Sequence, residues 1–232
     1  MFLTHYLYLP WEKLLKKRVH KFSNDRILHI LKILKKLYPD VKCALEHETP
    51  LQLLISTILS AQCTDKRVNM VTPFLFQKYK NAKEFACAKR EELEEMIRTT
   101  GFFRSKAKSI QETCRQISNE FHGEVPQTME QLTKLRGVGR KTANVVLGTA
   151  FGKNDGVVVD THVGRISRRL GLTKQKDPEK VERDLMKQIP RKEWTMFSHR
   201  LIWHGRKVCK ALKPNCPECG LAGVCPSREM VF

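Results

Sequence analysis

Apolar residues recur at helical spacing through most of this 232-residue chain. The clearest stripe consists of Ile27, Ile30, Leu31, Leu34 and Leu37. Apolar residues three and four positions apart share one face of a helix, so this stripe predicts a helix that packs on a core. Ser23 or Asn24 is expected to cap the helix, and Tyr38-Pro39 is expected to end it.

Capping and stop signals predict further helices along the chain. Thr49-Pro50 begins one that runs through Gln62, and Thr64 caps the next. The others run from Glu91 to Thr99 before Gly101, from Ser105 to near Gly123, from Asp177-Pro178 to Pro190, and from Trp194 to Lys210. Only Val157 to Val159 looks extended, and three residues do not make a sheet. We therefore expect an all-α fold with about ten helices.

Residues 128–150 predict two helices joined by a tight turn. Thr128 and Gln131 form a capping box, and helical spacing resumes in KTANVVLGTA after the turn. Gly137 and Gly139 allow positive φ angles and let a ligand approach the backbone, while the second helix offers N–H groups at its positive end. This helix-hairpin-helix suits a DNA phosphate, whereas the plainer alternative is an αα-corner with a glycine cap.

Charge strengthens the expectation of a polyanionic partner. The chain carries 43 Lys and Arg against 24 Asp and Glu, a formal net charge of +19. DNA or RNA is the first interpretation, although an anionic membrane surface or simple solubility would also account for the excess. No apolar run approaches the roughly 18 to 20 residues that span a bilayer, and MFLTHYLYLPW lacks the features of a signal peptide. We expect neither a membrane-bound nor a secreted protein.

Half of the eight cysteines gather in one short segment: Cys209, Cys216, Cys219 and Cys225. This distribution favours a reducing compartment and one metal site over disulfides. Four thiolates suit either a [4Fe–4S] cluster or a structural zinc ion, but zinc modules usually pair two C-x2-C knuckles and this segment has one. Lys210 and Lys213 lie between the first two of these cysteines and are expected to face the DNA backbone.

The block LRGVGRKTANVV followed by VDTHV resembles the helix-hairpin-helix and Gly/Pro…Asp signature of DNA glycosylases of the endonuclease III family. LSAQCTD at residues 59–65 and the spacing of the four cysteines are also similar to that family, so the likeness covers residues 25 to 227. Arg136 stands where the family usually has proline, and Phe102 where it often has leucine. These departures bear on the stiffness of the hairpin and on the shape of the group that enters the DNA stack.

The resemblance implies two helical domains with a DNA-binding cleft between them. One comprises residues 43–153, with the hairpin at 128–150, and the other joins residues 1–42 to residues 154–232. It also favours the [4Fe–4S] cluster over zinc. The implied partner is double-stranded DNA that contains damaged pyrimidines or abasic sites, and the expected protein is a monomer near the nucleoid of a bacterial cytoplasm.

The resemblance implies that Lys141 and Asp160 carry the catalysis. The matching lysine of the family attacks C1′ of an extruded nucleotide, forms a Schiff base and cuts the strand by β-elimination. Because a lysine amine is normally protonated, we expect the helix N-terminus, burial and neighbouring Arg140 or Arg136 to favour its neutral form. Asp160 is expected to cap the helix 161–170 and to stabilise positive charge on the deoxyribose or shuttle protons.

Extruding a base leaves a gap in the stack that side chains must fill. Gln62 matches the gap-filling residue of the family, and Phe102 lies where a wedge is expected, although core packing is the plainer interpretation for Phe102 or Phe103. Arg140 and His162 complete the candidate DNA contacts, with a structural role as the alternative for His162.

Together these features predict a bifunctional DNA glycosylase and abasic-site lyase of base excision repair that releases oxidised pyrimidines. A mismatch-specific glycosylase of the same superfamily is a near alternative, which Lys141 disfavours. The alternative from another class is a non-enzymatic DNA-binding protein with the hairpin and a zinc-stapled tail.

Overall fold

The chain is all-α, as predicted. The computed structural model describes residues 25–228, which contain no β-strand; Val157–Val159 is extended without a strand partner. The caps predicted at Ser23 or Asn24 lie outside the described residues. The helices are residues 25–37, α2 (Pro50–Leu59), α3 (Asp65–Lys78), α4 (Ala82–Cys87), α5 (Arg90–Ile97), α6 (Phe103–Glu120), α7 (Met129–Lys134), α8 (Arg140–Ala150), α9 (Thr161–Arg169), α10 (Pro178–Gln188) and α11 (Trp194–Lys207), with 3-10 turns η1 (Arg98–Thr100), η2 (Arg191–Glu193) and η3 (Ala222–Val224).

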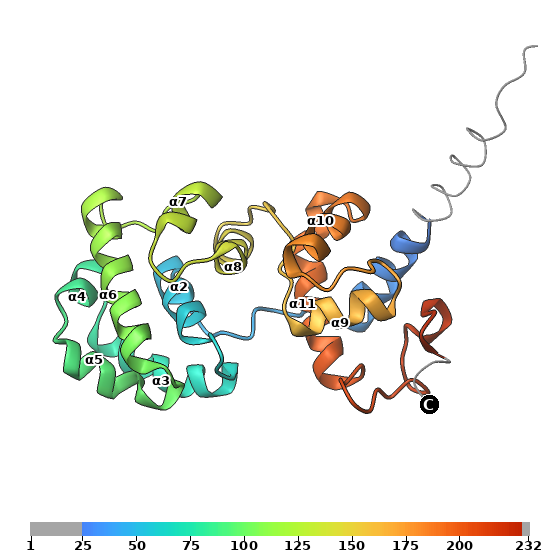
Figure 1. The fold of residues 1–232 in the computed structure, drawn as a ribbon, viewed down its shortest axis with the longest axis horizontal. Coiled ribbons are helices and arrows are strands. Elements are labelled where there is room, and N and C mark those ends of the chain that lie inside the picture. The colour runs from blue at the N-terminus through green and yellow to red at the C-terminus, as the bar shows by residue number, and fades with distance from the viewer. Residues whose placement is uncertain (1–24, 229–232) are drawn as a thin grey trace, which may run out of the picture.

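Buried apolar residues form two separate cores. The first lies among α2 to α8, from Leu45 to Leu147, and the second joins the helix 25–37 to α9, α10 and α11, from Ile27 to Leu221. We call these the first and second lobes. Figure 1 shows α2 to α7 on one side and α9 to α11 on the other, with α8 between them. The chain crosses between lobes twice, before α2 and after α8, so each core contains segments distant in sequence.

Side-chain caps begin several helices where the sequence predicts them. Thr49, Thr64, Thr128, Asp160 and Asp177 each accept a hydrogen bond from a backbone N–H in the first turn of the following helix. Such caps satisfy N–H groups that have no partner within the helix. The starts of α2, α3, α7, α9 and α10 are therefore fixed locally.

Several predicted boundaries are wrong. α2 ends at Leu59 and does not continue through Gln62, because Gln62 has a left-handed backbone, with φ of 52°, that a right-handed helix cannot include. α6 begins at Phe103, two residues before Ser105. Leu37 was also predicted to be buried with the apolar stripe of its helix, and it is not.

Leu37 is 41% exposed, because it stands at the end of its helix and packs beside Gly220 instead of in the core. The last long helix, α11, ends at Lys207 and not at Lys210. Beyond it the chain turns, and the N–H of Asn215 donates to the carbonyl of Val208 at 3.0 Å.

A buried carboxylate joins α8 to the second lobe. Glu182 of α10 accepts hydrogen bonds from Arg140 at 2.7 and 3.0 Å and from the Asn144 amide at 2.9 Å. The backbone of Gly156 passes so close that an added Cβ would stand 2.1 Å from the Glu182 carboxylate. Charge-assisted bonds of this kind fix the angle between the helices that carry them.

Candidate active site and nucleic-acid interface

A cavity of about 270 Å³ lies between the two lobes and brings together three of the predicted site residues. Gln62 comes from the turn after α2, Lys141 from the first turn of α8, and Asp160 from the residue before α9. Its remaining walls come from the segment 42–45, from α2, the start of α3, α8, Val158 and α11. Side chains from both lobes therefore face one space.

Lys141 is exposed at the edge of this cavity. Its position in the first turn of α8 places it near the positive end of that helix, as predicted. The Lys141 side chain is not buried in the chain alone, so the prediction of its burial is wrong. The neighbouring cations are also engaged, since Arg140 pairs with Glu182 and Arg136 pairs with Glu112 at 2.9 Å. In the chain alone, Lys141 is thus neither buried nor beside an unpaired guanidinium of Arg136 or Arg140.

Asp160 is held in place by its own helix. Its Oδ1 accepts a hydrogen bond from the N–H of Val163 at 2.7 Å, and its carbonyl accepts one from Gly164 at 2.9 Å. The predicted cap is therefore present. Oδ2 has no hydrogen-bond partner among the described residues, so one carboxylate oxygen orients the side chain while the other is available to the cavity.

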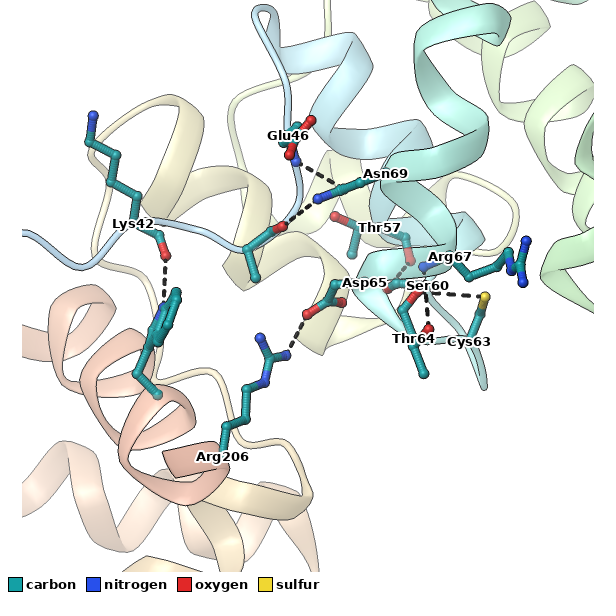
Figure 2. A network of polar contacts seen from close by, with 12 residues as sticks. Lys42, Glu46, Thr57, Ser60, Cys63, Thr64, Asp65, Arg67, Asn69 and Arg206 are labelled. Carbon is teal, nitrogen blue, oxygen red and sulfur yellow. Dashed lines mark hydrogen bonds and ion pairs between the residues drawn. The ribbon is translucent and has the colours of Figure 1, made fainter. Parts of the chain in front are cut away.

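Polar contacts join the segment 42–45 to α3 and α11 and α3 to α11 beside the cavity (Figure 2). Asp65, the first residue of α3, forms an ion pair with Arg206 of α11. Trp203 of α11 donates from Nε1 to the carbonyl of Lys42 at 3.4 Å, and Asn69 of α3 donates to the carbonyl of Ala44 at 2.9 Å. These contacts tie the crossing segment to α3 and α11, and so help to set the width of the space between the lobes.

Gln62 and Phe102 share an unusual backbone. Both have left-handed conformations, with φ of 52° and 48°, which non-glycine residues rarely adopt. Phe102 is 66% exposed, whereas its neighbour Phe103 packs against the first core. The alternative of core packing therefore holds for Phe103 and not for Phe102, whose role as a wedge stays a prediction. Two exposed side chains on strained turns are a feature of functional sites.

The two hairpin glycines differ in what they do. Gly137 has φ of 75°, and an added Cβ would stand 2.9 Å from the Cβ of Ser109 on α6. Gly139 has φ of −90°, so the prediction of a positive angle is wrong there, and nothing lies within 4 Å of an added Cβ. Gly137 therefore shapes the turn, while Gly139 leaves open space at the start of α8.

The hairpin is anchored to α6 through Arg136, the residue that replaces a proline. Thr113 donates to the carbonyl of Arg136 at 2.6 Å, and Gln116 accepts from its N–H at 3.4 Å. The guanidinium pairs with Glu112 at 2.9 Å. Proline could make neither of the last two contacts, so α6 supplies the restraint that a proline ring would otherwise give.

His162 packs inside the second lobe. Its Nδ1 lies 3.1 Å from a guanidinium nitrogen of Arg165, and the ring fills the space beside Gly205. Burial lowers the pKa of His162 below its ordinary value. A neutral, packed ring fits a structural role better than the predicted phosphate contact, which stays a prediction.

The four clustered cysteines line one small cavity under α9 and α11. Burial raises the pKa of the Cys219 and Cys225 thiols, and the other cysteines of the group raise it further. Among the described residues, no three His, Cys, Asp or Glu side chains converge tightly enough to hold a single metal ion. A [4Fe–4S] cluster spreads four cysteine ligands over four irons, and the four cysteines here line one cavity. The donor set fits the cluster.

Arginines of α9 support the loop between the first two of these cysteines. Arg169 donates to the sulfur of Cys209 at 3.2 Å and to the carbonyls of Lys210 and Ala211 at 2.8 Å. Arg165 donates to the Cys209 carbonyl at 2.9 Å. Lys210 and Lys213 are exposed on this loop, as a phosphate contact requires.

Sequence reasoning missed three residues near the site. Asp65 and Arg206 line the cavity, but each reads in sequence as an ordinary helix-end charge. Lys106 is only 5% exposed, although lysines are rarely buried. The burial of Lys106 could have been predicted from its position, because it falls on the apolar stripe of α6 with Phe103, Ala107 and Ile110.

None of the helices in residues 25–228 combines the length and apolarity that a membrane crossing requires.

Comparison with known proteins identifies similar chains. Residues 55–191 match the model of the HhH-GPD superfamily base excision DNA repair protein. The chain is 60% identical to endonuclease III of Synechocystis sp., across 93% of this chain and 98% of that protein. It is 46% identical to endonuclease III of Bacillus subtilis, across 82% and 86%.

Solved structures of endonuclease III bound to DNA are also similar to this chain. A non-covalent endonuclease III–DNA complex superposes with a TM-score of 0.84 at 46% identity, covering 89% of this chain and 97% of that chain. A trapped endonuclease III–DNA covalent intermediate gives the same TM-score at 45% identity, with the same coverage.

Proposed function

Because the chain belongs to the endonuclease III family of HhH-GPD base excision DNA repair proteins, we propose that it is a bifunctional DNA glycosylase and abasic-site lyase. Its substrate is double-stranded DNA with oxidised pyrimidines or abasic sites, and its place of action is the bacterial nucleoid. The observation that carries this proposal is that Lys141, Asp160 and Gln62 line one cavity between the lobes. The relative trapped as a covalent DNA intermediate supports an attacking group on the protein.

Lys141 is the nucleophile in this proposal. Its neutral amine forms a bond to C1′ of the extruded nucleotide, and the bond between C1′ and the base breaks, with the electron pair leaving on the base. The amine loses a proton, the C1′–O4′ bond breaks with its electron pair on O4′, which takes up a proton, and a C1′=N double bond forms, giving an imine. The imine makes the C2′ proton acidic, and removal of that proton expels the 3′ phosphate by β-elimination.

Asp160 stabilises the positive charge that develops on the sugar as the base leaves. Its Oδ1 is fixed by the Val163 N–H, so the carboxylate needs little reorganisation during the reaction. The second oxygen serves as the acceptor for the proton that the attacking amine releases.

The DNA is held around this site by the hairpin and the basic loop. The open backbone at Gly139 and the first turn of α8 receive one phosphate, while Lys210 and Lys213 contact others. Gln62 and Phe102 fill the gap left by the extruded base. Arg140 is engaged with Glu182, so its contribution is to hold α8 as well as to add positive charge.

Cys209, Cys216, Cys219 and Cys225 hold a [4Fe–4S] cluster in this proposal. When bound, the cluster cross-links the chain after α11, and Arg165 and Arg169 link the resulting loop to α9. The role is structural. Purified protein should contain about four irons per chain and absorb broadly in the visible region. Iron and zinc analysis after anaerobic purification is the measurement, and stoichiometric zinc without iron would contradict the assignment.

Borohydride trapping tests the proposed chemistry. Reduction of the imine should convert protein and a thymine-glycol or abasic duplex into a stable covalent adduct. Lys141→Gln should abolish the adduct, base release and strand cleavage while leaving duplex binding largely intact, because the hairpin backbone is unchanged. Adduct formation by Lys141→Gln at the wild-type rate would show that another amine attacks.

Asp160→Asn is the companion variant, because an amide oxygen can still accept from the Val163 N–H and cap α9. Folding should survive, while base release should slow by about 10² or more, the scale of one positioned electrostatic or acid–base group. Thermal denaturation checks the fold and single-turnover kinetics check the rate. An unchanged rate would remove Asp160 from the mechanism.

A further inference from the structure

Lys106 of α6 is a buried lysine that no part of the proposed chemistry uses. It is 5% exposed, and its ammonium donates to the carbonyl of Leu59 at 2.8 Å and to the carbonyl of Thr100 at 2.7 Å. Leu59 is the last residue of α2, and Thr100 is the last residue of η1. One side chain therefore joins two turns that are separated by about forty residues of sequence.

The surroundings explain why a cation is stable there. The last carbonyls of a helix lack partners within the helix and carry partial negative charge. Lys106 satisfies one such carbonyl at the end of α2 and one at the end of η1. Burial lowers the pKa of the Lys106 ammonium, so its charge is held at a desolvation cost that these two carbonyls offset.

The two turns that Lys106 joins carry the two gap-filling candidates. Gln62 follows Leu59 by three residues, and Phe102 follows Thr100 by two. The backbone N–H of Lys106 also donates to the carbonyl of Phe102 at 3.0 Å. Among the described residues, only Gln62, Phe102 and His122 are non-glycine residues with positive φ. Strained backbone of this kind persists only where its surroundings hold it.

We propose that Lys106 is a positioning residue that fixes the Gln62 turn and the Phe102 turn relative to each other, so that both side chains enter the DNA stack in register. This inference rests on the gap-filling role of Gln62 and Phe102 in the proposed function. Lys106 itself touches no DNA, because its ammonium is buried and both of its acceptors belong to the protein.

Lys106→Met tests this role, because methionine keeps most of the buried volume and removes the donors. Base release from a thymine-glycol duplex should slow about tenfold or more, on the scale of lost charge-assisted hydrogen bonds. Cleavage of a preformed abasic duplex should stay within about twofold, because an abasic site needs less extrusion. Lys108→Met, at an exposed position of the same helix, is the matched control and should leave both rates unchanged. A general loss of structure would slow both substrates equally and would overturn the inference.

The Gln62→Ala, Phe102→Ala double variant separates this inference from the proposed function. If Lys106 acts through these side chains, adding Lys106→Met to the double variant should slow base release little further. A full additional loss would overturn the inference while leaving gap filling intact. If the double variant alone releases the base at the wild-type rate, gap filling fails, and the inference fails with it.

A probe in the opposite strand reports insertion directly. A duplex with 2-aminopurine opposite thymine glycol should change fluorescence when protein side chains enter the stack, and Lys106→Met should slow that change. If the methionine variant does not fold, Lys106→Gln replaces it, because a shorter amide cannot reach both carbonyls. The same selective loss is expected, and wild-type insertion by a folded Lys106→Gln would overturn the proposal.

Discussion

The functional residues of this chain are positioned partly by local contacts that the sequence pattern predicts, and partly by contacts between distant residues that it does not predict. The cap at Asp160 is a short-range pattern, and it forms where the pattern predicts it. No local preference favours the left-handed turns at Gln62 and Phe102; Lys106, which is distant from Gln62 in sequence, donates to the carbonyls of Leu59 and Thr100 beside them. Two of the wrong helix boundaries, the end of α2 and the start of α6, lie next to these turns.

The two hairpin glycines make separate predictions. Gly137→Ala should lower stability by about 1–2 kcal/mol or more, because alanine is strained at positive φ and its Cβ would press on Ser109. Gly139→Ala should leave stability nearly unchanged, because that position has ordinary φ and open space.

For DNA binding we expect the opposite ranking, with Gly139→Ala having the larger effect. If a phosphate approaches the start of α8, the added methyl group of Gly139→Ala should weaken duplex binding about tenfold in a folded protein. Urea unfolding and fluorescence anisotropy measure the two quantities on the same samples. Equal binding by Gly139→Ala and wild type would place the phosphate elsewhere.

At the scale of elements, the second lobe depends on contacts between its helices and α8. His199 of α11 lies within 3.3 Å of the Thr149 hydroxyl of α8, and it lines the cavity. Burial lowers the pKa of His199 below its ordinary value, and nearby His47 lowers it further. The imidazole is therefore more easily protonated in the unfolded chain than in the folded one.

This difference predicts a stability that falls in acid. Above pH 6.5, the ordinary value for histidine, the group is neutral in both states; as the pH falls below that value the unfolded chain takes up the proton first. His199→Gln should reduce the loss of stability between pH 7 and pH 5, by at most about 1.4 kcal/mol per pH unit. Part of the slope should remain, because burial also lowers the pKa of His204, to about 4.

Urea midpoints at several pH values measure this effect. His29→Gln, at an exposed position of the helix 25–37, is the control and should follow the wild-type profile. A His199→Gln profile parallel to that of the wild type would show that protonation of His199 is not linked to folding.

At the scale of the whole molecule, the sequence predicts the helical class and most helix starts, because these depend on spacing and caps. The division of the buried residues into two cores was implied only by family resemblance, since each core joins segments that no local pattern connects. The cavity follows from that arrangement. Asp65 and Arg206 became recognisable as cavity residues only once α3 and α11 were placed beside each other.

The positive charge of the molecule is not all available to DNA. Arg165 and Arg169 of α9 donate to carbonyls of the cysteine-rich loop. Arg168 likewise donates to the carbonyl of Gln175 at 3.4 Å. The hairpin, Lys210 and Lys213 remain, which gives roughly three neutralised phosphates. Because each contributes about −0.9 to the slope of log K against log salt, we expect a slope of about −3.

Two variants test which charges contribute to this slope. Lys210→Ala with Lys213→Ala should make it shallower by about 2, because each lysine removed releases one counterion fewer on binding. Lys83→Ala is the control, because Lys83 is exposed on α4, at the far side of the first lobe from the second (Figure 1), and should leave the slope unchanged. Anisotropy titrations of an undamaged duplex from low to moderate salt give these slopes. If the two loop lysines changed the slope no more than Lys83 does, the cysteine-rich loop would face away from the DNA, and the basic contacts would have to be sought on the hairpin side of the cavity alone.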